Sequence, residues 1–377
     1  MSSELSVAMP RAHGPLSEEL HLRSKRERFP ISGGIELTHR CNLACIHCYV
    51  NLPSNDRAAA ARELTTDEWF RVLDQCAEAG VLWLTLTGGE IFSRRDFAAI
   101  YEHALAKGFL VTLYTNATMV TESIAELLSD RPPFSVEVSI YGADAAHYES
   151  TTQVPGSFAR FERGVERLRS AGVPLLMKCP ISTLSSDHVD ALVQWCTERS
   201  LPFKADPVID ARHDGGQQPT LYRIEPRRVL ALRDHLYELR NGRRRPAGPL
   251  PECAVRGEAS EIDELYTCGA GRIAFFVDAL GNASHCVIDR EPAFPILEMP
   301  WDQLWSEMGA WVTQPLPDHA PCSGCSLRGG CSNCPARARL ATGSPFLKDQ
   351  YQCDITHAIH GLPPSVPAAR PLAGCTA

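Results

Sequence analysis

The sequence predicts an α/β protein, a partial TIM-like (βα)6 barrel followed by a small cysteine-rich domain. Short apolar runs alternate with amphipathic segments between residues 31 and 210, which is the pattern of consecutive parallel βαβ units. Polar residues and glycines follow several of these runs, where a barrel collects its functional groups. Of the 15 cysteines in the chain, most of those beyond the barrel crowd between residues 253 and 353.

Six strands and the helices between them account for the predicted barrel. Apolar runs and two-residue alternation predict strands at 34–37, 81–87, 110–114, 134–140, 175–181 and 203–209. Helices are predicted at 66–79, 97–107, 122–128, 158–170 and 188–199. Thr65 or Thr66 is suited to cap the first helix, and Gly80 is suited to end it. Right-handed crossovers would curl these units into an incomplete barrel.

Composition divides the chain into five parts. We expect an N-terminal extension (1–30), the barrel (31–210), a connector with a basic helix (211–252), the cysteine-rich domain (253–353) and a disordered tail rich in Pro and Ala (354–377). Within the cysteine-rich domain, a hairpin is predicted from 273–277 and 282–287, and a packing helix at 301–305.

Charge and hydropathy exclude several classes of protein. The formal net charge of −8 argues against nucleic acid as a partner. No run of 18 apolar residues predicts a membrane span, and the first 30 residues lack the apolar region of a signal peptide. We therefore expect a cytoplasmic enzyme, in which thiols stay reduced and 15 cysteines indicate metal binding rather than disulfides.

Cys41, Cys45 and Cys48 form the most informative motif of the chain, with the spacing C-x3-C-x2-C and no fourth cysteine nearby. Thiolates hold iron–sulfur clusters, and three ligands on a four-iron cluster leave one iron open to bind a small molecule. A zinc site usually needs two C-x2-C pairs. Buried structural cysteines are the other alternative.

This triplet resembles the signature of the radical S-adenosylmethionine (SAM) superfamily, with His47 in the position that is usually aromatic. The resemblance implies that the open iron binds the amino and carboxylate groups of SAM. It also implies that one electron, supplied by a flavodoxin or ferredoxin, cleaves SAM to a 5′-deoxyadenosyl radical. That radical would abstract a hydrogen atom from the substrate.

Further residues of the SAM site follow from the same resemblance. Gly88, Gly89 and Glu90 stand where the second strand ends and resemble the GGE motif, whose backbone meets the SAM amino group. Asn116 and Ser139 end the third and fourth strands and are expected to contact SAM. The arginine that pairs with the SAM carboxylate in several relatives is replaced here. The remaining candidates, none of which we assign, are the hydroxyls of residues 150–152, Arg160 and Arg163.

The distal cysteines resemble the SPASM module, which holds two auxiliary [4Fe-4S] clusters and would bring the total to three. Local spacing alone leaves a zinc ribbon as an alternative. The resemblance implies that Cys253, Cys268, Cys286 and Cys334 would ligate the first cluster. It assigns Cys322, Cys325, Cys331 and Cys353 to the second. If Cys253 is not a ligand, the first auxiliary cluster has an open iron.

Four cysteines lie outside these sets. Cys76 and Cys196 fall in amphipathic helices and are expected in the core, and Cys375 falls in the tail. Cys179 ends the fifth strand, where we expect a structural cysteine rather than one at the barrel mouth.

The resemblance implies a radical SAM oxidoreductase whose substrate radical loses an electron to an auxiliary cluster and a proton to a base. Asp206, Asp210 and Lys178 are the candidate bases at strand ends, with Glu137 less favoured in mid-strand. Our leading hypothesis is maturation of a ribosomally made precursor peptide, by cross-linking or oxidative decarboxylation, as in the pyrroloquinoline quinone and mycofactocin enzymes. Sulfatase maturases are disfavoured because Val287, not aspartate, follows Cys286.

Two alternatives and one partner complete the expectations. The 40 residues before the triplet are too short for a fused leader-binding domain, so a separate leader-binding protein is expected. The first alternative is small-molecule chemistry, either alcohol dehydrogenation or modification of a tetrapyrrole side chain. The second is a non-catalytic iron–sulfur or zinc scaffold.

Overall fold

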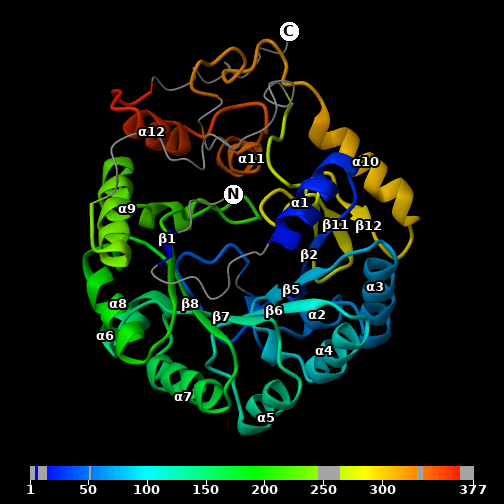
Figure 1. Cartoon of the computed structure of the whole chain (residues 1–377), viewed down its shortest axis with the longest axis vertical. Coiled ribbons are helices and arrows are strands. Elements are labelled where there is room, and N and C mark those ends of the chain that lie inside the picture. The colour runs from blue at the N-terminus through cyan, green and yellow to red at the C-terminus, as the bar shows by residue number, and fades with distance from the viewer. Residues whose placement is uncertain are drawn as a thin grey trace.

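A single mixed sheet forms the centre of the molecule (Figure 1). The computed structural model describes residues 5–6, 15–50, 52–244, 264–328, 331 and 334–365. The strand order is β1-β9-β8-β7-β6-β5-β2-β10-β11-β12. The strands are β1 (Leu5–Ser6), β2 (Ser32–Thr38), β5 (Trp83–Gly88), β6 (Leu110–Thr115), β7 (Ser135–Ser139), β8 (Leu175–Pro180), β9 (Phe203–Asp206), β10 (Ala274–Val277), β11 (Asn282–Ser284) and β12 (Phe294–Pro295).

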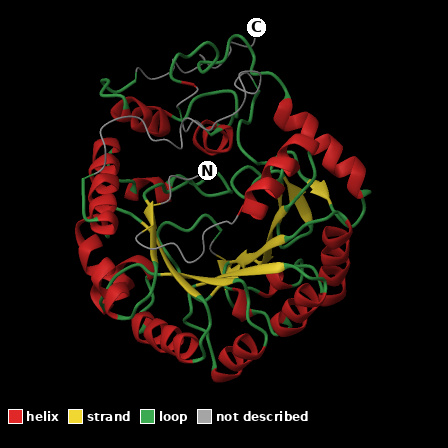
Figure 2. Cartoon of the chain, viewed as in Figure 1, coloured by secondary structure: helices red, strands yellow, loops and turns green. Residues whose placement is uncertain are grey.

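The six predicted barrel strands are present, and they pair in parallel from β2 to β9. Figure 2 shows the strands as an inner wall with helices outside it. The helices of this outer layer are α3 (Thr66–Glu78), α4 (Phe97–Ala106), α5 (Glu122–Asp130), α6 (Ala145–Thr152), α7 (Ser157–Ser170) and α8 (Val189–Glu198). Helix α6 was not predicted, because its sequence has almost no apolar periodicity.

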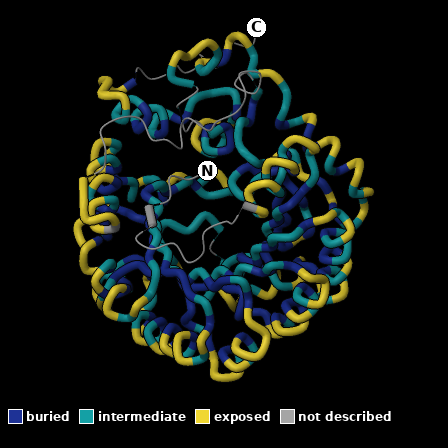
Figure 3. Tube along the Cα trace, in the orientation of Figure 1, coloured by how far each residue is buried: buried dark blue, intermediate teal, exposed yellow. Residues whose placement is uncertain are grey.

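The two faces of the barrel sheet differ in polarity. Leu84, Leu86, Val111 and Leu113 belong to the core between strands and helices. The residues that alternate with them in β6, such as Tyr114, are only half-buried, because successive side chains of a strand point to opposite faces. Burial in Figure 3 follows the same division, with exposed residues on the outside of the helices. The inner wall of the barrel is therefore free to carry polar groups.

The cysteine-rich region continues the barrel sheet. The predicted hairpin is present as β10 and β11, which pair in antiparallel fashion. Its parallel pairing with β2, in which Phe276 lies opposite Gly34, was not predicted. Beyond the hairpin, α10 (Trp301–Thr313), α11 (Pro335–Thr342) and α12 (Gln350–Ile359) lie over the open side of the barrel (Figure 1). The connector supplies α9 (Pro226–Asn241), whose neighbour α12 it contacts.

The expected disordered tail is wrong for its first twelve residues. Asp354 lies inside α12, and its carboxylate accepts a hydrogen bond from the Ser365 backbone N–H at 2.8 Å. Residues 366–377, including Cys375, lie outside the described residues. At the other end of the chain, α1 (Pro15–Glu27) was also not predicted. No helix in the described ranges is long and apolar enough to cross a membrane.

Candidate functional site

The three cysteines of the triplet gather on one loop beside the ends of β2 and β5. Cys41 closes the short strand β3 (Arg40–Cys41), which pairs with β4 (Leu52–Pro53). Burial, the charge of Glu90 and the charge of Cys48 raise the pKa of Cys41 to about 12. Burial, followed by Cys48 and Cys41, raises the pKa of Cys45 as well. Each thiolate thus disfavours the others, and together they need a cationic partner.

Hydrogen bonds to α6 hold this loop. The backbone N–H of Ala44 donates to Thr152 O at 3.0 Å, and that of Ile46 donates to Thr151 O at 3.1 Å. These carbonyls belong to the last turn of α6, where carbonyl groups have no partner within the helix. The unpredicted helix therefore has a clear purpose, since it anchors the segment between the first and third cysteines.

The chemistry of the donor set fits a four-iron cluster. Among the described residues, no three His, Cys, Asp or Glu side chains converge tightly enough to hold a single metal ion. A cubane cluster differs because each thiolate binds a separate iron. Amide donors point at the sulfur of Cys41, from Leu43 N at 3.4 Å and from Asn116 Nδ2 at 3.6 Å. Such donors stabilise thiolate charge.

Gly88 and Gly89 lie where the chain passes very close to the β2–β3 backbone. A Cβ on Gly88, where φ is +136°, would lie 2.3 Å from Thr38 O, and one on Gly89 would lie 2.3 Å from Arg40 O. Gly89 N donates to Thr38 O at 2.8 Å. The sequence suggested that these glycines make room for a ligand, whereas the structure shows that they first make room for the chain itself. Ligand contact by this backbone stays a prediction.

Glu90 is fully buried, and its carboxylate joins two strand ends. It accepts hydrogen bonds from Thr115 Oγ1 at 2.7 Å, Asn116 N at 2.8 Å and Phe92 N at 3.2 Å. Burial raises the pKa of Glu90 to about 7. The side chain therefore positions Asn116, which in turn reaches Cys41, and its described hydrogen-bond donors all belong to the protein.

His47, Ser139 and Thr151 border the cysteine loop. The ring of His47 lies 5.2 Å from the ring of Tyr141, and burial lowers the pKa of His47 to about 4, so the imidazole is neutral. Tyr141 is hydrogen-bonded by both Cys45 and Ser139. His47 Nδ1 and Thr151 Oγ1 are buried without a hydrogen-bond partner among the described residues. Buried orphan atoms of this kind fit a bound ligand.

Of the candidates for the carboxylate partner, Thr151 is therefore best placed. Arg163 is exposed on α7, and Arg160 is half-buried there.

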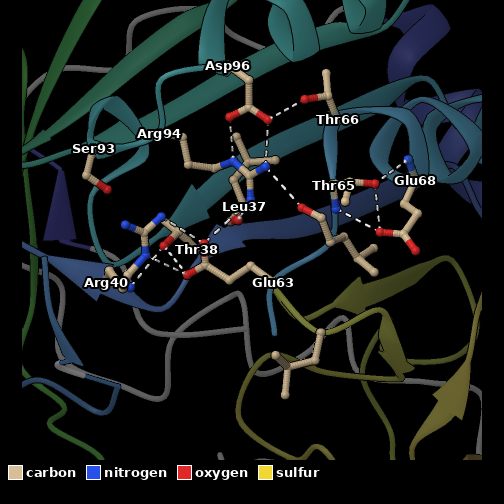
Figure 4. A network of polar contacts seen from close by, with 12 residues as sticks. Leu37, Thr38, Arg40, Glu63, Thr65, Thr66, Glu68, Ser93, Arg94 and Asp96 are labelled. Carbon is tan, nitrogen blue, oxygen red and sulfur yellow. Dashed lines mark hydrogen bonds and ion pairs between the residues drawn. The ribbon is translucent and has the colours of Figure 1, made fainter. Parts of the chain in front are cut away.

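A buried ionic network holds the segment that leads into the triplet (Figure 4). Arg40 makes a bidentate contact with Glu63, at 3.1 Å from Nε to Oε1 and 2.9 Å from Nη2 to Oε2. Arg94 donates to Leu37 O at 2.9 Å and to Leu64 O at 3.0 Å, and it pairs with Asp96 at 2.7 Å. None of these side chains was singled out from the sequence. An arginine directly before the first cysteine was the available signal.

The distal cysteines gather in the two predicted sets. Burial, followed by Cys334, raises the pKa of Cys286 to about 12, and Cys268 adds to the effect. Burial and Cys331 raise the pKa of Cys322 to about 11, and Cys325 and Cys353 add to it. Cys253, the expected fourth member of the first set, lies outside the described residues. The structure thus brings together three thiols of one set and all four of the other.

The candidate bases line the inner wall of the barrel in different surroundings. Lys178 Nζ lies 3.5 Å from Glu137 Oε2, 3.5 Å from Tyr114 Oη and 4.5 Å from the centre of the Tyr114 ring. Asp210 pairs with Arg337 at 2.8 Å. Asp206 is the last residue of β9, and burial raises its pKa, while Arg337 opposes the shift.

A second polar cluster on the inner wall was missed by the sequence. Glu36 is fully buried and pairs with Arg290 at 2.8 Å and with His39 at 3.1 Å. His213, from the predicted connector, makes an edge contact with the Tyr49 ring at 5.0 Å. Its backbone N–H donates to Tyr49 O at 3.2 Å. The connector is thus a wall of the site beside Cys48, which spacing alone could not show.

The remaining described cysteines are structural. Cys76, Cys179 and Cys196 are each at most 1% exposed and lie in the main core. The prediction for these three is confirmed. Cys179 faces the helices because its neighbour Lys178 takes the inward position of β8.

Comparison with known proteins gives the sequence relatives of this chain. Residues 35–195 match the model of the radical SAM superfamily. AdoMet-dependent heme synthase of Methanosarcina barkeri is 27% identical over 336 residues, which cover 84% of this chain and 94% of the relative. Mycofactocin maturase MftC of Mycobacterium ulcerans is 26% identical, covering 86% and 88%. PqqA peptide cyclase of Methylocella silvestris is 33% identical, covering 44% and 43%.

Comparison of structures confirms the fold class. SuiB of Streptococcus suis, solved with S-adenosylmethionine bound, superimposes with a TM-score of 0.66 at 16% identity. The match covers 91% of this chain and 84% of SuiB. The predicted partial barrel with an appended cysteine-rich region is therefore the observed architecture.

Proposed function

Because this chain belongs to the radical SAM superfamily, we propose that it is an oxidoreductase that cleaves SAM and abstracts a hydrogen atom from a precursor peptide. The observation that carries the proposal is the sorting of the thiols around one polar barrel interior. Three stand on the loop after β2, and the others form the two distal sets. Separate thiol sets at one site suit a reaction that moves electrons as well as a hydrogen atom.

Cys41, Cys45 and Cys48 would hold the cluster whose open iron binds SAM, and that cluster would supply the electron that cleaves SAM. The chain contributes the surroundings. His47 offers a neutral imidazole, and Asn116 is held by Glu90. The hydroxyl of Thr151 lacks a partner among the described side chains. Backbone contact at Gly88, Gly89 and Glu90, and side-chain contact at Asn116 and Ser139, complete the proposed SAM site.

The distal sets would hold two auxiliary [4Fe-4S] clusters in a SPASM-type domain, with Cys253 as the fourth ligand of the first cluster. Cys268, Cys286 and Cys334 pack against a small apolar cluster that includes Leu265 and Val312. Cys325 is exposed, so the second set lies within reach of an electron-transfer partner. A flavodoxin or ferredoxin is the proposed donor, and a reducing cytoplasm is the setting such thiols need.

A precursor peptide is the favoured substrate because two of the relatives named above are a peptide cyclase and a peptide-cofactor maturase. The reaction would be a cross-link or an oxidative decarboxylation, with a separate protein presenting the leader segment. Val287 after Cys286 continues to disfavour the formylglycine reaction.

Tetrapyrrole side-chain modification is the second candidate. The heme synthase relative aligns with 84% of this chain and with 94% of its own length. That alignment extends through both the barrel and part of the cysteine-rich region, so it favours this candidate specifically.

The test is anaerobic incubation of the reconstituted protein with SAM, dithionite and synthetic peptides encoded beside its gene. We expect 5′-deoxyadenosine and a peptide whose mass has decreased, and neither product with Cys45→Ala. A peptide of unchanged mass together with an oxidised iron-coproporphyrin would favour the second candidate. Bound zinc without 5′-deoxyadenosine would instead indicate a non-catalytic scaffold.

A further inference from the structure

Asp206 occupies a distinctive place on the inner wall. It is the last residue of β9 and lies opposite Pro180 of β8, on the side of the sheet to which Lys178 also points. Its Oδ1 accepts a hydrogen bond from Val208 N at 3.0 Å. The charged or titratable groups around it are Lys178 from β8, Asp210 after β9, Arg337 from α11 and Tyr351 from α12.

Arg337 connects this strand end with the first distal thiol set. Its Nε lies 2.8 Å from Asp210 Oδ1, and the two side chains are only 13% and 11% exposed. Cys334 is the N-cap of α11, so Arg337 follows it within the first turn. The guanidinium opposes the rise in the pKa of Cys334 that burial causes, and it does the same for Asp206. One buried cation therefore serves a cluster thiolate and two carboxylates.

The other candidate bases are already engaged. Asp210 is neutralised by Arg337, and Lys178 is held between Glu137 and Tyr114. Asp206 makes no ion pair within the described part of the chain, and burial raises its pKa, which makes its carboxylate the stronger base.

We propose that Asp206 is the general base that deprotonates the substrate radical, and that Arg337 is a positioning residue that links Asp206 to the cluster held by Cys268, Cys286 and Cys334. This inference rests on the proposed function. It adds the residue that receives the proton and the direction in which the electron leaves.

The step balances in atoms and electrons. The 5′-deoxyadenosyl radical takes a hydrogen atom from a substrate C–H bond and becomes 5′-deoxyadenosine. The substrate radical then gives a proton to the Asp206 carboxylate and an electron to the oxidised first auxiliary [4Fe-4S] cluster. The substrate has lost two hydrogens, and the reduced cluster returns its electron to the external donor.

The first arm of the test uses the precursor peptide that the wild-type protein modifies. In Asp206→Asn we expect continued formation of 5′-deoxyadenosine, with oxidised peptide formed about a hundredfold more slowly. Residual turnover should rise with pH as solvent replaces the base. Asp187→Asn removes an exposed carboxylate on the outside of the barrel and is the control. An unchanged ratio of oxidised peptide to 5′-deoxyadenosine in Asp206→Asn would overturn the assignment.

The second arm needs no substrate, so it separates failure of this inference from failure of the proposed function. Cys41, Cys45 and Cys48 are all replaced by Ala, and the auxiliary clusters are titrated by electron paramagnetic resonance between pH 6 and pH 8. We expect the midpoint potential of the first auxiliary cluster to fall as pH rises, because reduction favours protonation of Asp206. Asp206→Asn should remove that dependence.

Arg337→Gln should weaken the dependence, and Arg337→Lys should restore part of it, because lysine keeps the charge without the forked geometry. An identical pH dependence with and without Asp206 would contradict the link between this carboxylate and the cluster.

Discussion

At the scale of single residues, Glu90 shows how a motif residue can work through its neighbours. Its carboxylate is buried, holds Thr115 and Asn116, and has a pKa raised from 4.5 to about 7. A carboxyl whose pKa is raised on folding binds its proton more tightly in the folded state. Its contribution to stability therefore falls as pH rises from 4.5 toward 7.

Glu90→Gln does not titrate, so the difference in unfolding free energy between wild type and variant should depend on pH. We expect Glu90→Gln to be destabilising, because one of its amide ends cannot accept from Asn116 N or Thr115 Oγ1. The destabilisation should be smaller at pH 8 than at pH 6 by about 1 kcal/mol. Urea unfolding of the cluster-free protein at both pH values measures it. A difference that grows with pH would show that the carboxylate is stabilised as an ion.

Gly89→Ala tests the close approach at the end of β5. A Cβ at this position would lie 2.3 Å from Arg40 O, so the strand before Cys41 must shift. We expect iron bound by the triplet to be lost, together with SAM binding measured by calorimetry. Gly80→Ala is the matched control, because its Cβ would meet nothing within 4 Å. Gly80 has a φ of +89°, so that variant should lower stability by about 1 kcal/mol without loss of iron.

At the scale of elements, the cysteine loop depends on β3 and on the buried ionic network beneath it. Glu63 stands between Arg40 and Arg94 with a side chain that is only 3% exposed. Glu63→Gln keeps the shape and removes the charge, leaving two guanidinium groups without their shared carboxylate. We expect a loss of about 3 kcal/mol in unfolding free energy. Iron at the triplet should fall while the distal sets keep theirs.

The control for this network is Glu68→Gln. Glu68 caps α3 in an exposed capping box with Thr65, so its change should cost about 1 kcal/mol or less and leave the iron content unaltered. Equal stability and iron content in Glu63→Gln and Glu68→Gln would contradict a positioning role for the network.

Most barrel elements could be predicted from the sequence, because the buried β-strands are continuous apolar runs and amphipathic periodicity marks most of the helices between them. Helix α6 could not, since its apolar periodicity is nearly absent and its value lies in the carbonyls that hold Ala44 and Ile46. The triplet and the distal sets were visible because cysteine spacing is local. Glu63 and Arg94 were not, since they are 31 residues apart and meet only in the fold.

At the scale of the whole molecule, the cysteine-rich region and the barrel share one sheet. Strand β10 pairs with β2, the strand that leads to Cys41, and Arg290 of the following turn pairs with Glu36 of β2. The first distal set is thus tied to the same strand as the triplet. Such a direct connection suits electron transfer between fixed positions, and it explains why β10 could not be placed from its own sequence.

The central claim is that three separate thiol sets hold three clusters around one barrel, and iron analysis of anaerobically reconstituted protein tests it most directly. We predict about 12 irons per chain in the wild type, from three four-iron clusters. Replacing Cys41, Cys45 and Cys48 together with Ala should leave about 8 irons, held by the two distal sets. About 4 irons in the wild type, with zinc in the distal sets, would contradict the account.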